Sequence, residues 1–148
     1  MEKNNRSKSV AAVVIKDGCV LLARHSYGIR KGSLIVPGGY VEEGEMPEEA
    51  AARELLEETG IKAKITQLIG IRFNTKDWYA VFSAEYLDGE AHSDNNENTQ
   101  VLWLPLEEVA AHEDIPDLTK KLIECALKEK RLCKIDYIGK NPPYSFYG

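Results

Sequence analysis

Residues 42 to 58 gather negative charge on a segment whose two ends carry the marks of one short helix. The segment holds eight Glu and one Arg, a net charge of −7, while the whole chain has a net charge of −5. The remainder therefore carries about +2, by subtraction (−5 minus −7), so the acidity is local. Pro47 suits the first helical turn, and Gly60 suits the position just past the last one. Such a concentration of carboxylates indicates a site for a cation.

The spacing within residues 47–59 predicts an apolar face and an acidic face on this helix. Glu54, Glu57 and Glu58 stand at i, i+3 and i+4, so they share one face. Two of these acids fall in the last turn, where the helix dipole disfavours negative charge by roughly 0.3–1 kcal/mol each. Local rules that are broken together often mark a functional site. The stripe expected to face the core consists of Ala51, Ala52, Leu55 and Leu56.

The acidic face indicates a site for a hard divalent cation. Mg²⁺ takes oxygen ligands and commonly binds through a few carboxylates together with substrate phosphates. Ahead of the helix, Gly38 and Gly39 permit positive φ and a close approach to a ligand, which would expose a carbonyl oxygen as a further ligand. Arg53 is within reach of Glu49 and Glu57, and of an acid across the loop, so it could hold carboxylates in fixed rotamers.

The chain resembles the Nudix hydrolase family at every defining position of the Nudix box. A chance match of seven fixed residues in a chain of this length has a probability on the order of 10⁻⁵ or less. The similarity extends over about residues 8 to 131. The matching pattern reads Gly39-x5-Glu45-x7-Arg53-Glu54-Leu55-x-Glu57-Glu58-x-Gly60-Ile61.

The resemblance implies a hydrolase that cleaves a diphosphate linkage in a nucleoside diphosphate joined to another moiety. It implies Mg²⁺ as the cofactor, with Mn²⁺ as a substitute. Glu57 and Glu58 would be direct metal ligands, the Gly39 carbonyl another, and Glu54 either a ligand or the general base. The remaining box residues are Arg53, which we expect to act in catalysis by orienting acids, and Gly38, Glu45 and Gly60, which we expect to be structural. The alternative is a non-catalytic nucleotide sensor.

Outside the Nudix box, the sequence gives only weak signals for substrate-binding residues. Arg24 and Arg30 precede the glycines and either meet substrate phosphates or form a charged rim. Tyr79 could stack on a base. Glu97, in the loop before Trp103, is a candidate for an additional acid. The resemblance implies a small-molecule nucleotide as the substrate, and ADP-ribose, nucleotide sugars and nucleoside triphosphates all stay open.

Alternating strand and helix patterns predict an α/β fold with a mixed sheet packed between helices, and the Nudix resemblance implies an α/β/α sandwich. Asp17-Gly18 between two apolar runs predicts a hairpin. A last amphipathic helix is expected over about residues 117–131. Strands are expected over residues 10–15, 19–24, 34–36, 64–73, 78–87 and 101–104, with a short one around Val41.

Composition fits a single domain over residues 1–148, with its core over about 8–131 and a C-terminal tail over 132–148. No apolar run approaches the roughly 20 residues of a membrane span. Residues 1–8 are polar, without the apolar centre of a signal peptide. We therefore expect a cytoplasmic protein with neither a membrane nor a nucleic acid as partner. Cys19, Cys125 and Cys133 show no paired spacing, so neither a disulfide nor a zinc site is predicted.

The tail over residues 132–148 is too aromatic for an ordinary disordered segment. Three interpretations stay open: it docks on its own domain, it packs within a homodimer, or it closes over the substrate. Docking on its own domain is the default expectation.

Overall fold

Eight strands and two helices make up the computed structural model, which describes residues 6–129, 135–140, 142 and 144–148. Two short 3₁₀ helices lie at Gly28–Arg30 and Leu106–Glu108. The elements are β1 (Lys8–Lys16), β2 (Cys19–His25), β3 (Leu34–Ile35), β4 (Gly38–Tyr40), α1 (Pro47–Thr59), β5 (Lys62–Asn74), β6 (Trp78–Asp88), β7 (Asn98–Pro105), α2 (Asp117–Leu127) and β8 (Tyr144–Tyr147).

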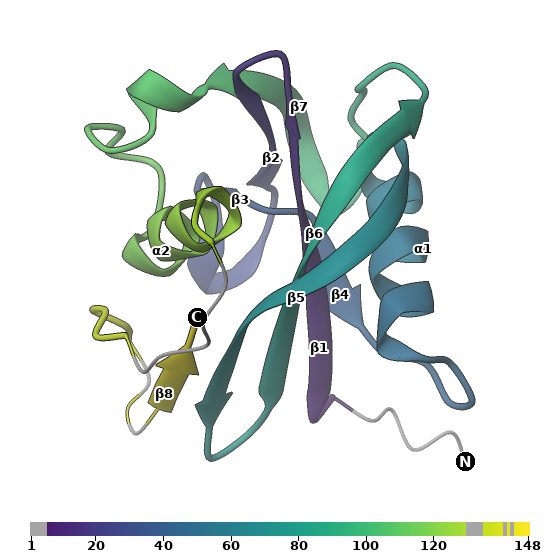
Figure 1. Ribbon diagram of the computed structural model, residues 1–148. Coiled ribbons are helices and arrows are strands. Elements are labelled where there is room, and N and C mark those ends of the chain that lie inside the picture. The colour runs from purple at the N-terminus through teal and green to yellow at the C-terminus, as the bar shows by residue number, and fades with distance from the viewer. Residues whose placement is uncertain (1–5, 130–134, 141, 143) are drawn as a thin grey trace.

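Strand β1 lies in the middle of the molecule and buries both of its faces. Ala11 and Val13 belong to one core together with residues of α2, whereas Val10 and Ala12 belong to a second core together with residues of α1. Because successive side chains of a strand point to opposite faces, the sheet lies between the two helices (Figure 1). The α/β/α sandwich with a mixed sheet is thus confirmed.

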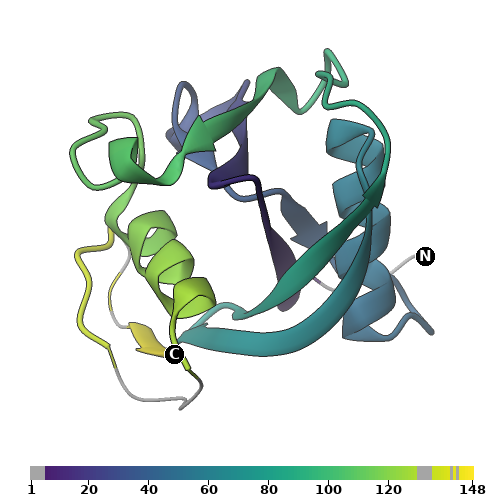
Figure 2. The ribbon, with the colours of Figure 1, turned by 45° about the horizontal axis from the view of Figure 1, so that its top comes forward.

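The sheet contains both parallel and antiparallel pairs. Its main order is β3-β2-β1-β6-β5-β8, with β4 also paired to β1 and β7 to β2. Strand β1 runs parallel to β6, while β4 runs antiparallel to β1 and β5 antiparallel to β6. The long strands β5 and β6 run side by side as a curved pair across the molecule (Figure 2).

One line of paired residues crosses the sheet, and we call it the cross-sheet row. Tyr40 pairs with Ser9, Ser9 with Tyr79, Tyr79 with Arg72, and Arg72 with Phe146. Residues that lie directly opposite one another share a face of the sheet. Tyr79 and Phe146 pack with the core on the α2 side. The row therefore lies on the face of the sheet that α2 covers in part.

The ends of α1 confirm the prediction from Pro47 and Gly60. Gly60 adopts the left-handed conformation at φ 74, and its N–H donates to the oxygen of Leu56.

The apolar stripe predicted for α1 was partly wrong. Leu56 is 51% exposed, while Ala50 is fully buried. The stripe is rotated because the face that packs on the sheet runs through Ala50, Ala51 and Leu55 and continues into Glu58.

Several other elements follow the sequence expectations with shifted ends. The hairpin turn has positive φ at Asp17 and Gly18, as an Asp-Gly turn requires. The strand expected around Val41 is β4, which ends at Tyr40, and β7 begins at Asn98, ahead of the expected start. Helix α2 ends at Leu127 rather than near residue 131, and residues 130–134 lie outside the described part.

The C-terminal tail docks on its own domain, as the default interpretation expected. Strand β8 pairs antiparallel with β5, and Phe146 is fully buried against the core on the α2 side.

Cys19 and Cys125 are free thiols, and Cys133 lies outside the described residues. Within the described ranges, no helix is long and apolar enough to cross a membrane.

Candidate functional site

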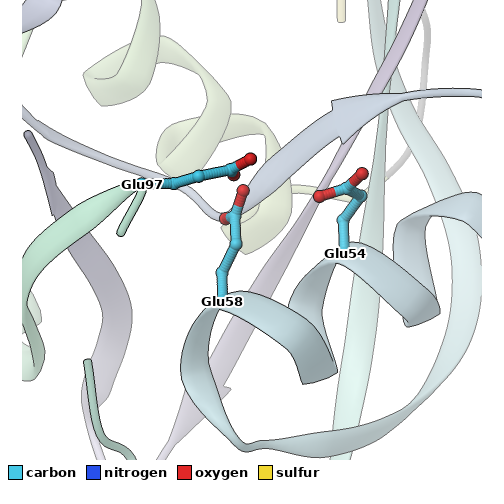
Figure 3. A group of neighbouring side chains, drawn as sticks. All are labelled: Glu54, Glu58 and Glu97. Carbon is cyan, nitrogen blue, oxygen red and sulfur yellow. The ribbon is translucent and has the colours of Figure 1, made fainter. Parts of the chain in front are cut away.

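Three carboxylates from two distant parts of the chain converge at one point. Glu54 and Glu58 extend from α1, and Glu97 comes from the residue immediately before β7. One carboxylate oxygen from each lies within 4.8 Å of the others, and the three groups point toward one another (Figure 3). The sequence singled out all three residues, but only the fold shows that they meet.

The surroundings of this acid cluster raise the pKa values of two of its acids. Glu58 is 8% exposed, and burial raises its pKa to about 10, with help from a hydrogen bond to Glu97 and the charge of Glu54. Burial also raises the pKa of Glu54, although the adjacent Arg53 opposes that shift. Because carboxylates at this separation repel one another and are removed from water, protons or a cation must neutralise part of their charge.

Arg53 holds the acids of the box together through its whole guanidinium. Its Nε and Nη2 donate to the two carboxylate oxygens of Glu45 at 2.7 and 3.0 Å, and its Nη1 donates to Glu54 at 2.9 Å and to Glu57 at 3.2 Å. Nη2 also donates to the main-chain oxygen of Tyr40 at 3.1 Å. The hydrogen bonds from Arg53 lower the pKa of Glu45. The described contacts of Arg53 do not include Glu49, which the helical spacing had suggested.

Gly38 and Gly39 serve the site by close approach rather than by unusual backbone angles. Neither has a positive φ, so that part of the sequence expectation was wrong. A Cβ atom at Gly39 would collide with the carboxylate of Glu54, and one at Gly38 would collide with the backbone of Val10. The N–H of Gly38 donates to Glu58 at 3.2 Å. Only glycines let β4 lie between β1 and these carboxylates.

Glu57 lies apart from the acid cluster. Its side chain is 59% exposed and pairs with Arg53. Because α1 turns by about 100° per residue, a helix that buries Glu54 and Glu58 on its inner face leaves Glu57 at the rim. The structure therefore brings Glu97, rather than Glu57, next to Glu54 and Glu58, and the metal-ligand role that the resemblance implies for Glu57 stays a prediction.

The loop that carries Glu97 is fastened to the end of α1. Asn98 is buried, and its Nδ2 donates to the main-chain oxygen of Glu58 at 2.9 Å. The main-chain oxygen of Glu97 accepts from the N–H of Ser26 at 3.0 Å, which ties the loop to the end of β2. Sequence reasoning missed Asn98, because an asparagine before a strand carries no signal of a long-range contact.

A cavity of about 840 Å³ opens beside the acid cluster. Burial lowers the pKa of His25 on its wall, with a smaller contribution from Arg30, and burial raises the pKa of Tyr79 to about 12. The volume is within the usual range of small-molecule sites. The wall includes His25, Tyr27, Arg30, Tyr40, Tyr79 and the three clustered acids.

Arg24 does not line this cavity, contrary to one sequence expectation. Its guanidinium donates to the main-chain oxygen of Gly32 at 2.7 Å, to Asp114 at 2.9 Å and to Gln100 at 3.1 Å. These contacts join β2 to two loops. Of the two arginines considered for phosphate binding, the structure brings only Arg30 to the cavity.

Two further cavity residues had no signal in the sequence. Arg72 and Asp77 form an ion pair at 2.6 Å, and the side chain of Arg72 is 7% exposed. A basic residue in a predicted strand and an acidic one in a predicted turn are ordinary features. They meet because β5 and β6 form a hairpin that brings the turn back onto the strand.

The donor set fits a hard divalent cation. The clustered ligands are all carboxylate oxygens, and burial raises the pKa values of Glu54 and Glu58, so a bound cation would favour their charged forms. Oxygen-only sites of this kind suit Mg²⁺ or Mn²⁺ better than metals that prefer nitrogen or sulfur.

Comparison with known proteins identifies the family. The sequence model of the NUDIX domain matches residues 5–124. A MutT-like protein of Streptomyces ambofaciens is 37% identical over 106 residues, which cover 70% of this chain and 67% of that protein. An ADP-ribose pyrophosphatase of Methanocaldococcus jannaschii is 41% identical over 63 residues, which cover 43% of this chain and only 37% of that protein.

A solved structure shares the fold. The NUDIX domain of Shewanella oneidensis NrtR, in complex with ADP ribose, matches with a TM-score of 0.69 and 26% identity. The match covers 82% of this chain and 86% of that domain.

Proposed function

Since this chain belongs to the Nudix family of hydrolases, we propose that it cleaves a diphosphate linkage in a nucleoside diphosphate joined to a second group. The proposed cofactor is Mg²⁺, for which Mn²⁺ can substitute. The observation that carries the proposal is the meeting of Glu54, Glu58 and Glu97 on the wall of a nucleotide-sized cavity.

The clustered acids would hold the metal, and the other box residues would support them. A bound ion supplies Lewis acidity, which neutralises phosphate oxygens and lowers the pKa of water. Glu54 is the candidate for either a metal ligand or the general base. Arg53 holds Glu54 and Glu45 in fixed rotamers through charged hydrogen bonds, so it acts as a positioning residue. The Gly38 N–H does the same for Glu58.

The cavity also supplies charge for the substrate. Arg30 lies on its wall and would attract the phosphates of an incoming nucleotide. The exposed Tyr27 and Tyr40 also line the cavity and offer aromatic surface to the rest of the substrate. ADP-ribose, nucleotide sugars and nucleoside triphosphates are the substrate candidates. ADP-ribose occurs in the names of two of the similar proteins.

Hydrolysis of a nucleotide panel in millimolar Mg²⁺, with products separated by chromatography, tests the proposal. We expect turnover that disappears with a chelator and in Glu58→Gln. The alternative function is a nucleotide sensor, for which the complex of the NrtR domain with ADP ribose gives a precedent for binding. Tight binding of a panel member without any metal-dependent cleavage would favour the sensor and contradict the hydrolase.

A further inference from the structure

An ion pair between the buried Arg72 and the partly buried Asp77 lies in the cavity wall, and the proposed hydrolysis does not use it. Arg72 is 6% exposed, and its Nη1 and Nη2 donate to the two carboxylate oxygens of Asp77 at 2.6 and 3.4 Å. Ser9 Oγ donates to the same carboxylate at 3.0 Å. All three residues line the cavity. Burying two charges is costly unless their geometry and remaining hydrogen bonds are satisfied, so a pair placed at a cavity invites a polar ligand.

Arg72 stands well away from the acid cluster, while Asp77 reaches toward it through Ser9 on β1. In the cross-sheet row, Tyr40 follows the glycine that abuts Glu54, whereas Arg72 lies on the third strand from β4. Three strand spacings correspond to about 14 Å. With the diphosphate at the acid cluster, a ribose and its base can extend along the row toward Arg72. This step, and the inference as a whole, rests on the proposed function.

The charge balance at this end excludes a second phosphate. Asp77 neutralises Arg72 and would itself repel an anion. An apolar group is equally unsuited, because it would bury the remaining donors of Arg72 without partners. The ligand that fits is neutral and polar, as a nucleobase is.

The hydrogen-bonding capacity that remains on the pair consists mainly of donors. A guanidinium carries five N–H donors in a planar fork. Asp77 occupies the edge formed by Nη1 and Nη2, which leaves the edge formed by Nε and Nη2 with two parallel donors. The Asp77 oxygens already accept two bonds from Arg72 and one from Ser9. Such an edge matches two adjacent acceptors on a base.

We propose that Arg72, oriented by Asp77 and Ser9, reads a 6-oxopurine base, so that the substrate is a guanosine or inosine diphosphate derivative. Two parallel donors from an arginine pair with O6 and N7 of such a base. Adenine presents an amino group at the same position, which would oppose a donor with a donor. Guanosine and inosine derivatives therefore rank above the adenosine compounds that occur in the names of the similar proteins.

The aromatic ring of Tyr79 lies next to the Arg72 guanidinium. Tyr79 pairs with Arg72 in the cross-sheet row, and the guanidinium carbon of Arg72 lies 5.4 Å from the centre of the Tyr79 ring. The contact keeps the planar group against the ring. Arg72 thus has its position fixed from two sides, by Asp77 and by Tyr79, before any ligand arrives.

A binding measurement separates this inference from the hydrolase proposal. Calorimetry with the non-hydrolysable α,β-methylene analogues of inosine and adenosine diphosphate, in Mg²⁺, compares two ligands that differ only around position 6 of the base. We expect the wild type to bind the inosine analogue at least tenfold more tightly, the scale of one bidentate contact. This preference does not depend on turnover. If it is found without any hydrolysis, base recognition by Arg72 stands as a property of nucleotide binding while the hydrolase proposal fails.

The variant Arg72→Gln/Asp77→Asn gives a sharper test. It removes both charges together, so that neither is left buried alone. A glutamine pairs with N6 and N7 of adenine, so we expect the preference to reverse toward the adenosine analogue. Should this variant fail to fold, Arg72→Lys retains the charge without the planar fork and should abolish the preference.

Three results would overturn the inference. They are a wild type that binds the adenosine analogue as well or better, a wild type that binds neither analogue, and an inosine preference that survives in a folded Arg72 variant.

Discussion

Asn98 donates a hydrogen bond from its side chain to the main-chain oxygen of Glu58 at 2.9 Å, so the residue after one clustered acid is tied to the backbone of another. Asn98 is 3% exposed. Its Oδ1 is buried and has no hydrogen-bond partner within the described ranges. This contact sets how far Glu97 stands from Glu58.

Replacing Asn98 with alanine should loosen the acid cluster. The carbonyl of Glu58 would lose its buried partner, which costs about 1–3 kcal/mol in the free energy of unfolding. We also expect weaker Mn²⁺ binding, followed by electron paramagnetic resonance, and a lower kcat. Asn96→Ala, an exposed change in the same loop, is the control and should leave the free energy of unfolding, the Mn²⁺ affinity and kcat unchanged. Equal Mn²⁺ affinity in the two variants would contradict the positioning role.

The stability of the metal-free protein should fall as pH rises. Glu58 has a folded pKa of about 10 against an ordinary value of 4.5, mainly because it is buried. Between these values the folded state keeps a proton that the unfolded state has lost. The free energy of unfolding should therefore decrease by up to about 1.4 kcal/mol per pH unit in this window.

Urea unfolding at several pH values with a chelator present measures this slope. Glu58→Gln cannot lose a proton, so the slope should be much shallower and the variant more stable than the wild type at alkaline pH. Burial of Glu54 acts in the same direction, so a small slope should remain. Glu85→Gln, an exposed change on β6, should keep the wild-type slope. Parallel curves for wild type and Glu58→Gln would show that Glu58 is not the titrating group.

Arg53→Lys should lower kcat by about tenfold or more with a smaller effect on KM. Lysine keeps the charge but loses the planar fork that joins Glu45, Glu54 and Glu57. Arg24→Lys makes the same chemical change outside the cavity, and we expect it to reduce thermal stability rather than kcat. Steady-state kinetics of both variants provide the measurement. The orienting role is wrong if Arg53→Lys retains the wild-type kcat.

Mg²⁺ should raise the thermal midpoint through the acid cluster. A ligand that binds only the folded state adds roughly 2.7 kcal/mol at a hundred times its Kd, and a nucleoside diphosphate analogue should add more. Glu58→Gln and Glu97→Gln should blunt both shifts most strongly. Glu57→Gln should also lower turnover but should blunt the shifts less, because Glu57 lies outside the cluster. Sodium at matched ionic strength is the control, and an equal effect of sodium would contradict a specific site.

Local signals predicted the parts of the site that lie within one helix. Pro47, Gly60 and the spacing of Glu54 and Glu58 are read within a few residues of one another, and the structure agrees with them. The exposure of Leu56 and Glu57 was missed because it depends on how α1 is rotated against the sheet. Helical spacing fixes which residues share a face, but tertiary packing decides which face turns inward.

Contacts set by strand pairing and tertiary packing were not predictable in the same way. Arg72 and Asp77 lie only five residues apart, but they meet because the β5–β6 hairpin places the turn next to the end of β5. Asn98 meets Glu58 across 40 residues of sequence. A one-residue change in the pairing of β5 with β6, or of β7 with β2, would turn Arg72 or Asn98 to the opposite face of the sheet. Local sequence patterns do not determine which pairing forms.

The position of strand β1 has a consequence for how this protein unfolds. The strand contributes alternate side chains to both cores, pairs with β4 beside the carboxylates, and carries Ser9 beside Asp77. Separating β1 from the sheet would remove side chains from both hydrophobic cores at the same time. The two cores and the cavity should therefore melt as one cooperative unit, without a partly folded species that retains the acid cluster.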